Sequence, residues 1–300
     1  MTENELLRCV SRSFYLTIRL LPGGMRDDVS LAYLLARAAD TVADSPGGEP
    51  QKCLGVLKAA RASLGRPEIA GYRAQEWAEL QRDRADRGLL EAWPDLWRRM
   101  AARTGQDPDR LQVVLGHILD GQIFDLERFD GDRPPLTSDE LERYIYLVAG
   151  SVGEFWTDLG FARLGNFSPE APETMRSMGR HYGQGLQLVN ILRDRRMDAA
   201  MGRVYVDAAD VAHWSGRARA CLEEGARYCS ALASGRVRYA CLLPALLGWR
   251  TLALVESHPA ELLAPAKVPR VEVRRWMWRA LAAWWSPGAV ARLAREASGL

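Results

Sequence analysis

The 300-residue chain has the composition of an ordinary globular protein, with 48% hydrophobic and 26% charged residues. A formal net charge of +2, without any basic run, argues against a nucleic-acid partner. Its five cysteines include no C-x-x-C pair, which indicates reduced thiols in the cytoplasm. Arginines interrupt any apolar core near the N-terminus, and no run of about 18 apolar residues exists. We therefore expect neither a signal peptide nor a membrane-spanning segment.

Apolar residues recur with helical periodicity along the chain, and no alternating strand pattern stands out. Short breaks rich in glycine and proline separate the helical stretches, and none is long enough for a flexible linker. These patterns predict a single all-α domain over residues 1–300. The four histidines are isolated from one another, so we expect no zinc site.

The first polar cluster, Ser11-Arg12-Ser13, lies near the expected start of the first helix. Hydroxyls, a guanidinium and nearby backbone amides would suit a diphosphate. The tripeptide is a weak signal by itself, because serines and arginines are common on protein surfaces.

The segment from residue 33 to residue 44, YLLARAADTVAD, predicts a mostly buried helix with one narrow polar stripe. The stripe consists of Tyr33, Arg37, Asp40 and Asp44. On an α-helix these residues fall within an arc of roughly 60°, and their neighbours are apolar or small. Buried carboxylates are costly unless they are paired or bound to metal. An ion pair between Arg37 and Asp40 is therefore the alternative to a metal site.

Two further segments carry weaker signals. Asp120, Gln122 and Asp125 fit a solvated or locally paired face as well as they fit an active site. Later, a capping box of Thr137 and Glu140 opens a helix that we expect to reach residue 159. Small residues at 149–153 in this helix either let another segment pack closely or open a cavity wall.

A second polar stripe follows in the segment 187–198, QLVNILRDRRMD. It consists of Gln187, Asn190, Asp194 and Asp198, which fall within an arc of roughly 80° on a helix. An ion pair of Arg193 with Asp194 is again the simpler alternative. Two matching stripes with a D-x-x-x-D pair each favour a metal site, because four carboxylates facing one cavity would repel one another without cations. Hard oxygen ligands suit Mg²⁺, which commonly binds through carboxylates and substrate phosphates.

Together these segments resemble the squalene/phytoene synthase family, and most closely its bacterial squalene-forming members. The resemblance covers nearly the whole chain and rests on residues 11–14, 33–44, 144–153, 187–198 and 202–203. It implies an isoprenoid-synthase helical bundle around a central apolar cavity.

The resemblance also implies roles for individual residues. Catalytic roles fall to Tyr33, Arg37 and Tyr144. Metal ligands would be Asp40, Asp44, Asn190, Asp194 and Asp198. Substrate diphosphate would bind to Ser11, Arg12, Ser13, Arg37, Gln187, Arg193 and Arg203. The hydrocarbon pocket would include Phe14, Val148, Gly150, Leu186 and Tyr205, and NADPH would bind at Lys267 and Arg270.

The chain departs from the family pattern at two positions near the second stripe. Met197 stands where an acidic residue is common, and Asp207 stands where a proline is common. These differences put the shape of this loop and the reaction rate in question, whereas the expected metal ligands are intact.

The implied activity is that of a farnesyl-diphosphate farnesyltransferase of isoprenoid biosynthesis. It would condense two farnesyl diphosphates head-to-head through presqualene diphosphate, with Mg²⁺ (or Mn²⁺) assisting diphosphate loss, and reduce the product with NADPH to squalene. Alternative products are presqualene diphosphate, dehydrosqualene, hydroxysqualene and phytoene. A non-catalytic binding or assembly protein, and a structural bundle with ion-paired stripes, are remoter alternatives.

Tryptophans gather near the C-terminus, at positions 276, 278, 284 and 285, beside arginines at 274, 275 and 279. We expect these tryptophans to pack between helices, with an interfacial membrane contact as the alternative. The protein would be a cytoplasmic monomer or homodimer. A peripheral contact with the inner membrane face, for product release, is left open.

Overall fold

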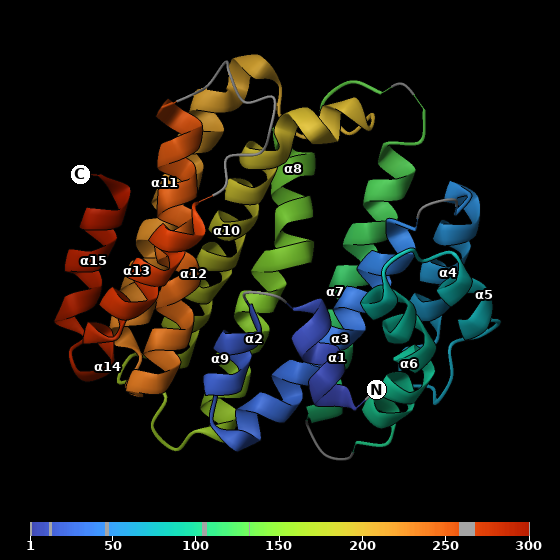
Figure 1. The fold of residues 1–300 in the computed structure, drawn as a ribbon, viewed down its shortest axis with the longest axis horizontal. Helices are drawn as coiled ribbons and strands as arrows, with labels where there is room; N and C mark the ends of the chain where they lie inside the picture. The colour runs from blue at the N-terminus through green and yellow to red at the C-terminus, as the bar shows by residue number, and fades with distance from the viewer. Residues whose placement is uncertain are drawn as a thin grey trace. The chain divides into compact units, whose positions relative to one another are not determined.

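The structure is a computed structural model that describes residues 2–299, except 12–13, 46–47, 104–106, 132 and 258–267, and except the side chains of Phe14 and residues 107–109. Every regular element in the described residues is a helix, which confirms the predicted all-α class (Figure 1). The chain divides into two compact units, Met1–Arg19 with Gly23–Asp130, and Leu20–Pro22 with Gly131–Leu300. A single domain over residues 1–300 stays a prediction.

The first unit is built on α3. Its helices are α1 (Glu3–Val10), α2 (Phe14–Leu20, whose last residue belongs to the second unit), α3 (Gly23–Ala43), α4 (Pro50–Ala62), α5 (Ala74–Glu79), α6 (Arg84–Ala101) and α7 (Asp107–Arg128). α3 packs against α1, α4, α6 and α7. Trp93 and Trp97 of α6 are fully buried, and their rings meet edge to face with centroids 6.1 Å apart. This apolar packing fixes the helix that carries the first aspartates.

The second unit is built on α10, the longest helix in the described residues. Its elements are α8 (Ser138–Ile145), the π-helical turn η1 (Tyr146–Gly150), α9 (Ser151–Arg163), α10 (Pro172–Ala200), the 3₁₀ turn η2 (Ala208–Asp210), α11 (Val211–Ala231), α12 (Gly235–Ser257), α13 (Arg270–Ala280), α14 (Ala282–Trp285) and α15 (Gly288–Ser298). α10 packs against α8, η1, α9, α11 and α12. α10 therefore runs through the middle of its unit (Figure 1).

The helix expected over residues 140–159 is confirmed at its start and corrected in its middle. The Thr137 hydroxyl accepts from the Glu140 amide at 3.2 Å, and the Glu140 carboxylate accepts from the Thr137 amide at 2.8 Å, which is a complete capping box. The run is interrupted by η1, whose π-helical hydrogen bonding adds a residue to one turn. Such turns are rare and often lie at functional sites.

Glycines let α9 and η1 touch the backbone of α10. A Cβ atom added to Gly153 would lie 1.9 Å from the Gly179 carbonyl oxygen, and one added to Gly183 would lie 2.2 Å from the Ala149 oxygen. Atoms cannot approach that closely, so only glycine fits at these two contacts. The small residues of this stretch therefore serve close helix packing, the first of the two predicted alternatives.

α12 is the one helix, in the part of the chain that the structure describes, whose length and composition would allow it to cross a membrane. Its apolar window is 61% buried inside the structure. Leu242, Leu246 and Trp249 of this helix are almost fully buried. The core helix of a globular unit shows such burial, and the expectation that no segment spans a bilayer stays a prediction.

The glycine contacts predict a large loss of stability for Gly153→Ala. The added methyl group must push α9 away from α10, so we expect the free energy of unfolding to fall by at least about 2 kcal/mol. Gly55→Ala is the matched control, because Gly55 is an exposed residue within α4 and nothing lies within 4 Å of its added Cβ. That variant should gain up to about 1 kcal/mol from helix propensity. Thermal and urea unfolding measure both; equal stabilities would contradict the close approach.

Candidate active site

The first aspartate stripe lies on α3, as the sequence predicts. Asp40 is in the last turn of α3, and Asp44 follows one residue beyond its end, with its amide donating to the Asp40 carbonyl at 2.9 Å. Both aspartates are exposed, whereas Leu34, Leu35 and Ala38 on the same helix are fully buried. α3 is therefore a mostly buried helix with a solvent-accessible polar stripe.

Arg37 does not form the ion pair with Asp40 that the sequence offered as an alternative. Its guanidinium lies 3.2 Å from the Asp86 carboxylate of α6. The reason is tertiary, because α6 packs against α3 and presents a carboxylate from outside the stripe. Tyr33, one turn before, donates its hydroxyl to the Val10 carbonyl at 3.3 Å. Both side chains are thereby oriented within the first unit.

Two residues of α7 that the sequence left undecided belong to this site. The Gln122 side-chain amide donates to an Asp40 carboxylate oxygen. Gln122 and Asp125 are both buried, with 7% exposure each. Asp120 instead pairs with Arg61 at 2.7 Å, on a half-exposed face. The signal that could have separated them is the i, i+3 spacing of Gln122 and Asp125 within an apolar helix.

Burial by surrounding protein atoms raises the pKa of Asp40 to about 6. Arg37 opposes the shift, while the negative charges of Asp44 and Asp125 add to it. The carboxylate is reached by solvent and yet is crowded by protein and by like charge. A nearby cation would favour the ionised form of such a carboxylate.

The donor set fits a hard divalent cation such as Mg²⁺. Asp40 and Asp44 supply carboxylate oxygens at an accessible position. Within the described ranges, no three Asp, Glu, His or Cys side chains converge closely enough to hold a metal alone. Mg²⁺ characteristically binds through one or two carboxylates and completes its shell with water and substrate phosphate. The residues present in the first unit therefore fit a cation whose coordination shell is completed by other ligands.

The second stripe lies on α10, again with the predicted pattern. Asn190 is exposed, and Gln187, Asp194 and Asp198 are half-buried. The intervening apolar residues Leu188, Val189, Ile191 and Leu192 are buried. Here the alternative ion pair is present. The Arg193 guanidinium donates to both oxygens of the Asp194 carboxylate, once at 2.9 Å, so a metal at Asp194 would share it with Arg193.

The turn after α10 positions two predicted site residues, Arg203 and Tyr205. Gly202 has a left-handed backbone, with φ of +81°, which favours glycine. The Arg203 amide then donates to the Asp198 carbonyl at 2.8 Å, which anchors this turn to the last aspartate. Tyr205 stacks on Tyr144 of α8 with ring centroids 5.3 Å apart and planes 21° apart. Both tyrosines are buried.

The two departures from the family pattern lie on the surface. Met197 is 48% exposed on the last turns of α10. Asp207 is exposed and its carboxylate accepts from the Ala209 amide at 2.9 Å, so it caps η2. A turn-starting aspartate therefore takes the position where proline is common.

Ion pairs that the sequence patterns did not predict link α9 to α10 and α8 to α11, and the first of them includes a buried carboxylate. Glu154 is 6% exposed and accepts from the Arg180 guanidinium at 2.6 Å and from the Tyr146 hydroxyl at 3.2 Å. Glu142 of α8 pairs with Arg217 of α11 at 2.8 Å. A carboxylate at position 154, inside an apolar helix, is the signal that could have indicated this network.

Other predicted site residues have plainer surroundings. Ser11 follows the end of α1 and precedes α2, so the expectation that it lies near the start of the first helix is wrong; its buried hydroxyl donates to the Leu7 carbonyl. Gly150 is buried against α10, while Val148 and Leu186 are half-buried. Arg270 is exposed at the start of α13. Arg12, Ser13, Lys267 and the side chain of Phe14 lie outside the described parts. The roles predicted for all of these residues stay predictions.

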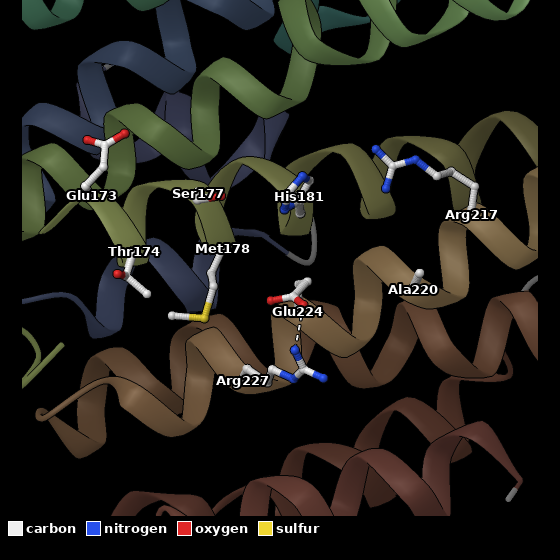
Figure 2. A pocket seen from close by; sticks show the side chains of 9 residues that line it. All are labelled: Glu173, Thr174, Ser177, Met178, His181, Arg217, Ala220, Glu224 and Arg227. Atoms are coloured by element: carbon white, nitrogen blue, oxygen red, sulfur yellow. Dashed lines mark hydrogen bonds and ion pairs between the residues drawn. The ribbon is translucent and has the colours of Figure 1, made fainter. Parts of the chain in front are cut away.

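An open groove of about 830 Å³ runs between α10 and α11 (Figure 2). Its walls carry Glu173, Thr174, Ser177, Met178, His181, Arg217, Ala220, Glu224 and Arg227. Arg227 pairs with Glu224 at 2.8 Å, and burial lowers the pKa of His181. None of the predicted site residues lines this groove, and its charged walls do not suit a hydrocarbon.

The raised pKa of Asp40 predicts that Asp40→Asn stabilises the metal-free protein. The folded-state value of about 6 exceeds the usual 3.8, so the folded protein binds the proton more tightly and stability falls as the pH rises between them. Near pH 7 the free energy of unfolding of the variant should be about 1 kcal/mol higher than that of wild type, because solvent screens part of the effect at this exposed position. Near pH 4 the two should be almost equal. Urea unfolding in EDTA at both pH values measures this.

Asp120→Asn is the control, since it removes an ion pair with Arg61 that is half-exposed. This variant should lose up to about 1 kcal/mol near pH 7. If Asp40→Asn also destabilised the protein near pH 7, the crowding of the Asp40 carboxylate would be contradicted.

Comparisons with known proteins agree with this arrangement. The squalene/phytoene synthase profile matches residues 7–215, which include both aspartate stripes. Over 207 residues the chain is 30% identical to the bifunctional lycopene cyclase/phytoene synthase of Podospora anserina, with 67% of this chain and 34% of that protein covered. Over 207 residues it is 29% identical to the squalene synthase of Homo sapiens, with 67% and 45% covered.

The chain thus spans between about a third and a half of the length of these two relatives. The solved complex of TcSQS with the ligand BPH1237 has the same fold, with a TM-score of 0.78 at 21% identity, and the match covers 98% of this chain and 89% of that one. With the aspartate stripes inside the matched region, the chain belongs to the squalene/phytoene synthase family, the head-to-head isoprenoid synthases.

Proposed function

We propose that the protein is a squalene synthase, which condenses two farnesyl diphosphates head-to-head through presqualene diphosphate and reduces the product to squalene. One observation carries the proposal. The C-terminal ends of two partly buried helices, α3 and α10, each carry a D-x-x-x-D pair on an accessible stripe, with Asp44 directly after α3. Both pairs lie inside the region that matches the family.

The aspartates would bind magnesium, with manganese as the alternative, for the diphosphate of an allylic substrate. Magnesium, when bound, would neutralise the charge that develops on the departing diphosphate. Asp40 and Asp44 supply carboxylates on α3, and Asp194 and Asp198 supply them on α10, with Asn190 beside them. The crowding that raises the pKa of Asp40 supports a cation-binding role, because bound positive charge would relieve the repulsion.

The arginines would bind phosphate oxygens. Arg37 is oriented by Asp86 and Arg193 by Asp194, so neither guanidinium has to be ordered when substrate binds. Arg203 lies five residues after the last aspartate, in a turn that its own amide fixes by donating to the Asp198 carbonyl. Ser11, Arg12, Ser13 and Gln187 would add further hydrogen bonds to the diphosphate.

Tyr144 would control the proton that is lost when the cyclopropane ring of presqualene diphosphate closes. Its stacking on Tyr205 fixes the direction of the phenol ring. The carbocation formed on loss of diphosphate must be kept from water, and apolar side chains are suited to that task. Phe14, Val148, Gly150, Leu186 and Tyr205 would line this pocket.

The reductive half of the reaction is the more specific part of the proposal. NADPH would bind at Lys267 and Arg270 and supply the hydride. Without that step the product would be presqualene diphosphate, dehydrosqualene or hydroxysqualene. Phytoene, a C40 product, is the further alternative and would require a C20 diphosphate in place of farnesyl diphosphate. A non-catalytic relative would be expected to have lost aspartates from the stripes, whereas this chain keeps all four.

We propose a cytoplasmic location, because the five cysteines are free thiols and four of them are buried.

Replacing one aspartate of each stripe tests the metal assignment. Asp40→Asn and Asp194→Asn should each lower the turnover of farnesyl diphosphate with Mg²⁺ at least about hundredfold, since several kcal/mol of charge stabilisation depend on the metal. Asp120→Asn, on the surface of α7, should keep activity within about twofold of wild type. Release of diphosphate measures the rate. Activity of Asp40→Asn within a few-fold of wild type would refute the assignment.

Product analysis tests the reductive step. We expect squalene from farnesyl diphosphate when NADPH is present, and a non-reduced product when NADPH is absent, because the second carbocation then finds no hydride. Gas chromatography with mass spectrometry of the extracted hydrocarbon distinguishes the products. If NADPH changed neither their identity nor their yield, the squalene assignment would fail while the family chemistry stood.

A further inference from the structure

An apolar stripe is exposed on the helical run from residue 270 to residue 285. Val271, Trp278 and Trp285 are 72%, 75% and 78% exposed, the three highest values among the large hydrophobic side chains of the described residues. They are spaced seven residues apart. On a continuous α-helix they would fall within an arc of about 40°.

The run is close to a continuous helix, so this spacing has structural meaning. Leu281, between α13 and α14, has helical dihedral angles of −58° and −27°. Its amide donates to the Trp278 carbonyl at 3.2 Å, and the Trp284 amide donates to the Leu281 carbonyl at 3.0 Å. Trp278 and Trp285 thus lie on one stripe that crosses the junction of the two helices.

The opposite face of the run is fixed to the rest of the second unit. Trp276 is 3% exposed, and its indole donates to Glu272 at 3.3 Å. Glu272 in turn accepts from Arg250 of α12 at 2.5 Å, and the Tyr239 hydroxyl of α12 donates to the Met277 carbonyl at 3.2 Å. α13 and α14 pack against α12 and α15 (Figure 1). The predicted tryptophan cluster therefore divides, since Trp276 is buried and the Trp284 ring centroid lies 6.1 Å from that of Tyr239, whereas Trp278 and Trp285 are exposed.

Positive charge flanks the exposed stripe. Arg274 and Arg275 are exposed on α13, and their helical positions lie on either side of Trp278. Glu272 is the one carboxylate in residues 270–285, and it is bound by Arg250, with Arg275 at 3.9 Å. The outward face of this run is therefore aromatic and basic.

We propose that this face binds peripherally to the surface of an anionic lipid bilayer. Tryptophans are enriched at the membrane–water interface, where an apolar ring with one polar N–H is well solvated. Arginines beside them would attract anionic headgroups, each strengthening binding by about fivefold. A second copy of the chain fits this face less well, because a twofold contact would bring the same arginines against each other. The proposal does not depend on which product the enzyme makes.

Vesicle sedimentation of the full chain tests the proposal. We expect binding to vesicles that contain phosphatidylglycerol, weaker binding to phosphatidylcholine alone, and loss of the difference at high salt. Trp278→Gln with Trp285→Gln should weaken binding at least about tenfold. Thermal unfolding of this variant should stay within a few degrees of wild type, because both side chains are exposed.

Two charge-reversal pairs distinguish binding by this particular face from a general effect of the protein's net charge. Arg274→Glu with Arg275→Glu should weaken binding to the anionic vesicles by at least about tenfold. Arg292→Glu with Arg295→Glu, at exposed positions of α15, changes the net charge equally and should keep binding within about twofold.

Three results would overturn the proposal. They are no binding of the wild-type chain to anionic vesicles, equal weakening by the two charge-reversal pairs, and a tryptophan variant that changes the mass in solution while vesicle binding is unchanged. The last result would make the face a protein interface.

Discussion

The enclosure of one carboxylate, Asp40, by protein atoms is the constraint on which the first unit's polar chemistry depends, and neighbouring carboxylates add to it. Asp40 lies where protein atoms and the charges of Asp44 and Asp125 disfavour its ionised form, while one arginine and one amide oppose them. Such an arrangement is less stable than an apolar one would be, and proteins keep it where a ligand compensates. The apolar packing of α3 against α4, α6 and α7 supplies the stability that holds the aspartates in place.

In the second unit, close backbone contact between helices holds the second aspartate stripe in place. Glycines on both sides of the α9–α10 contact bring the helices to a distance that no other residue allows. The π-helical turn η1 and the buried Glu154–Arg180 pair lie at the same contact. A helix held this rigidly carries its polar stripe at a defined angle, which is what the geometry of metal and diphosphate binding demands.

The proposed membrane face and the proposed chemistry would serve each other. Farnesyl chains and C30 hydrocarbons partition into lipid, so an enzyme that meets the bilayer surface shortens the path of a product through water. α13 and α14 are suited to such contact because their packing against α12 and α15 leaves two tryptophans outside the core. Attachment of this kind needs no spanning helix.

Local geometry explains what could be read from the sequence. The all-α class, the capping box at Thr137 and the two aspartate stripes follow from the rotation of 100° per residue, which a helix keeps whatever surrounds it. The glycines of residues 149–153 indicated a close approach, although the sequence could not exclude a cavity wall.

The tertiary structure decided which side chains meet across helices. Arg37 pairs with Asp86, 49 residues away, and Gln122 reaches Asp40 across 82 residues. The stacking of Tyr144 on Tyr205 and the division of the tryptophans into packed and exposed ones are of the same kind. The physical reason is that helical periodicity specifies the face on which a residue lies, whereas its partner depends on how neighbouring helices pack against that face.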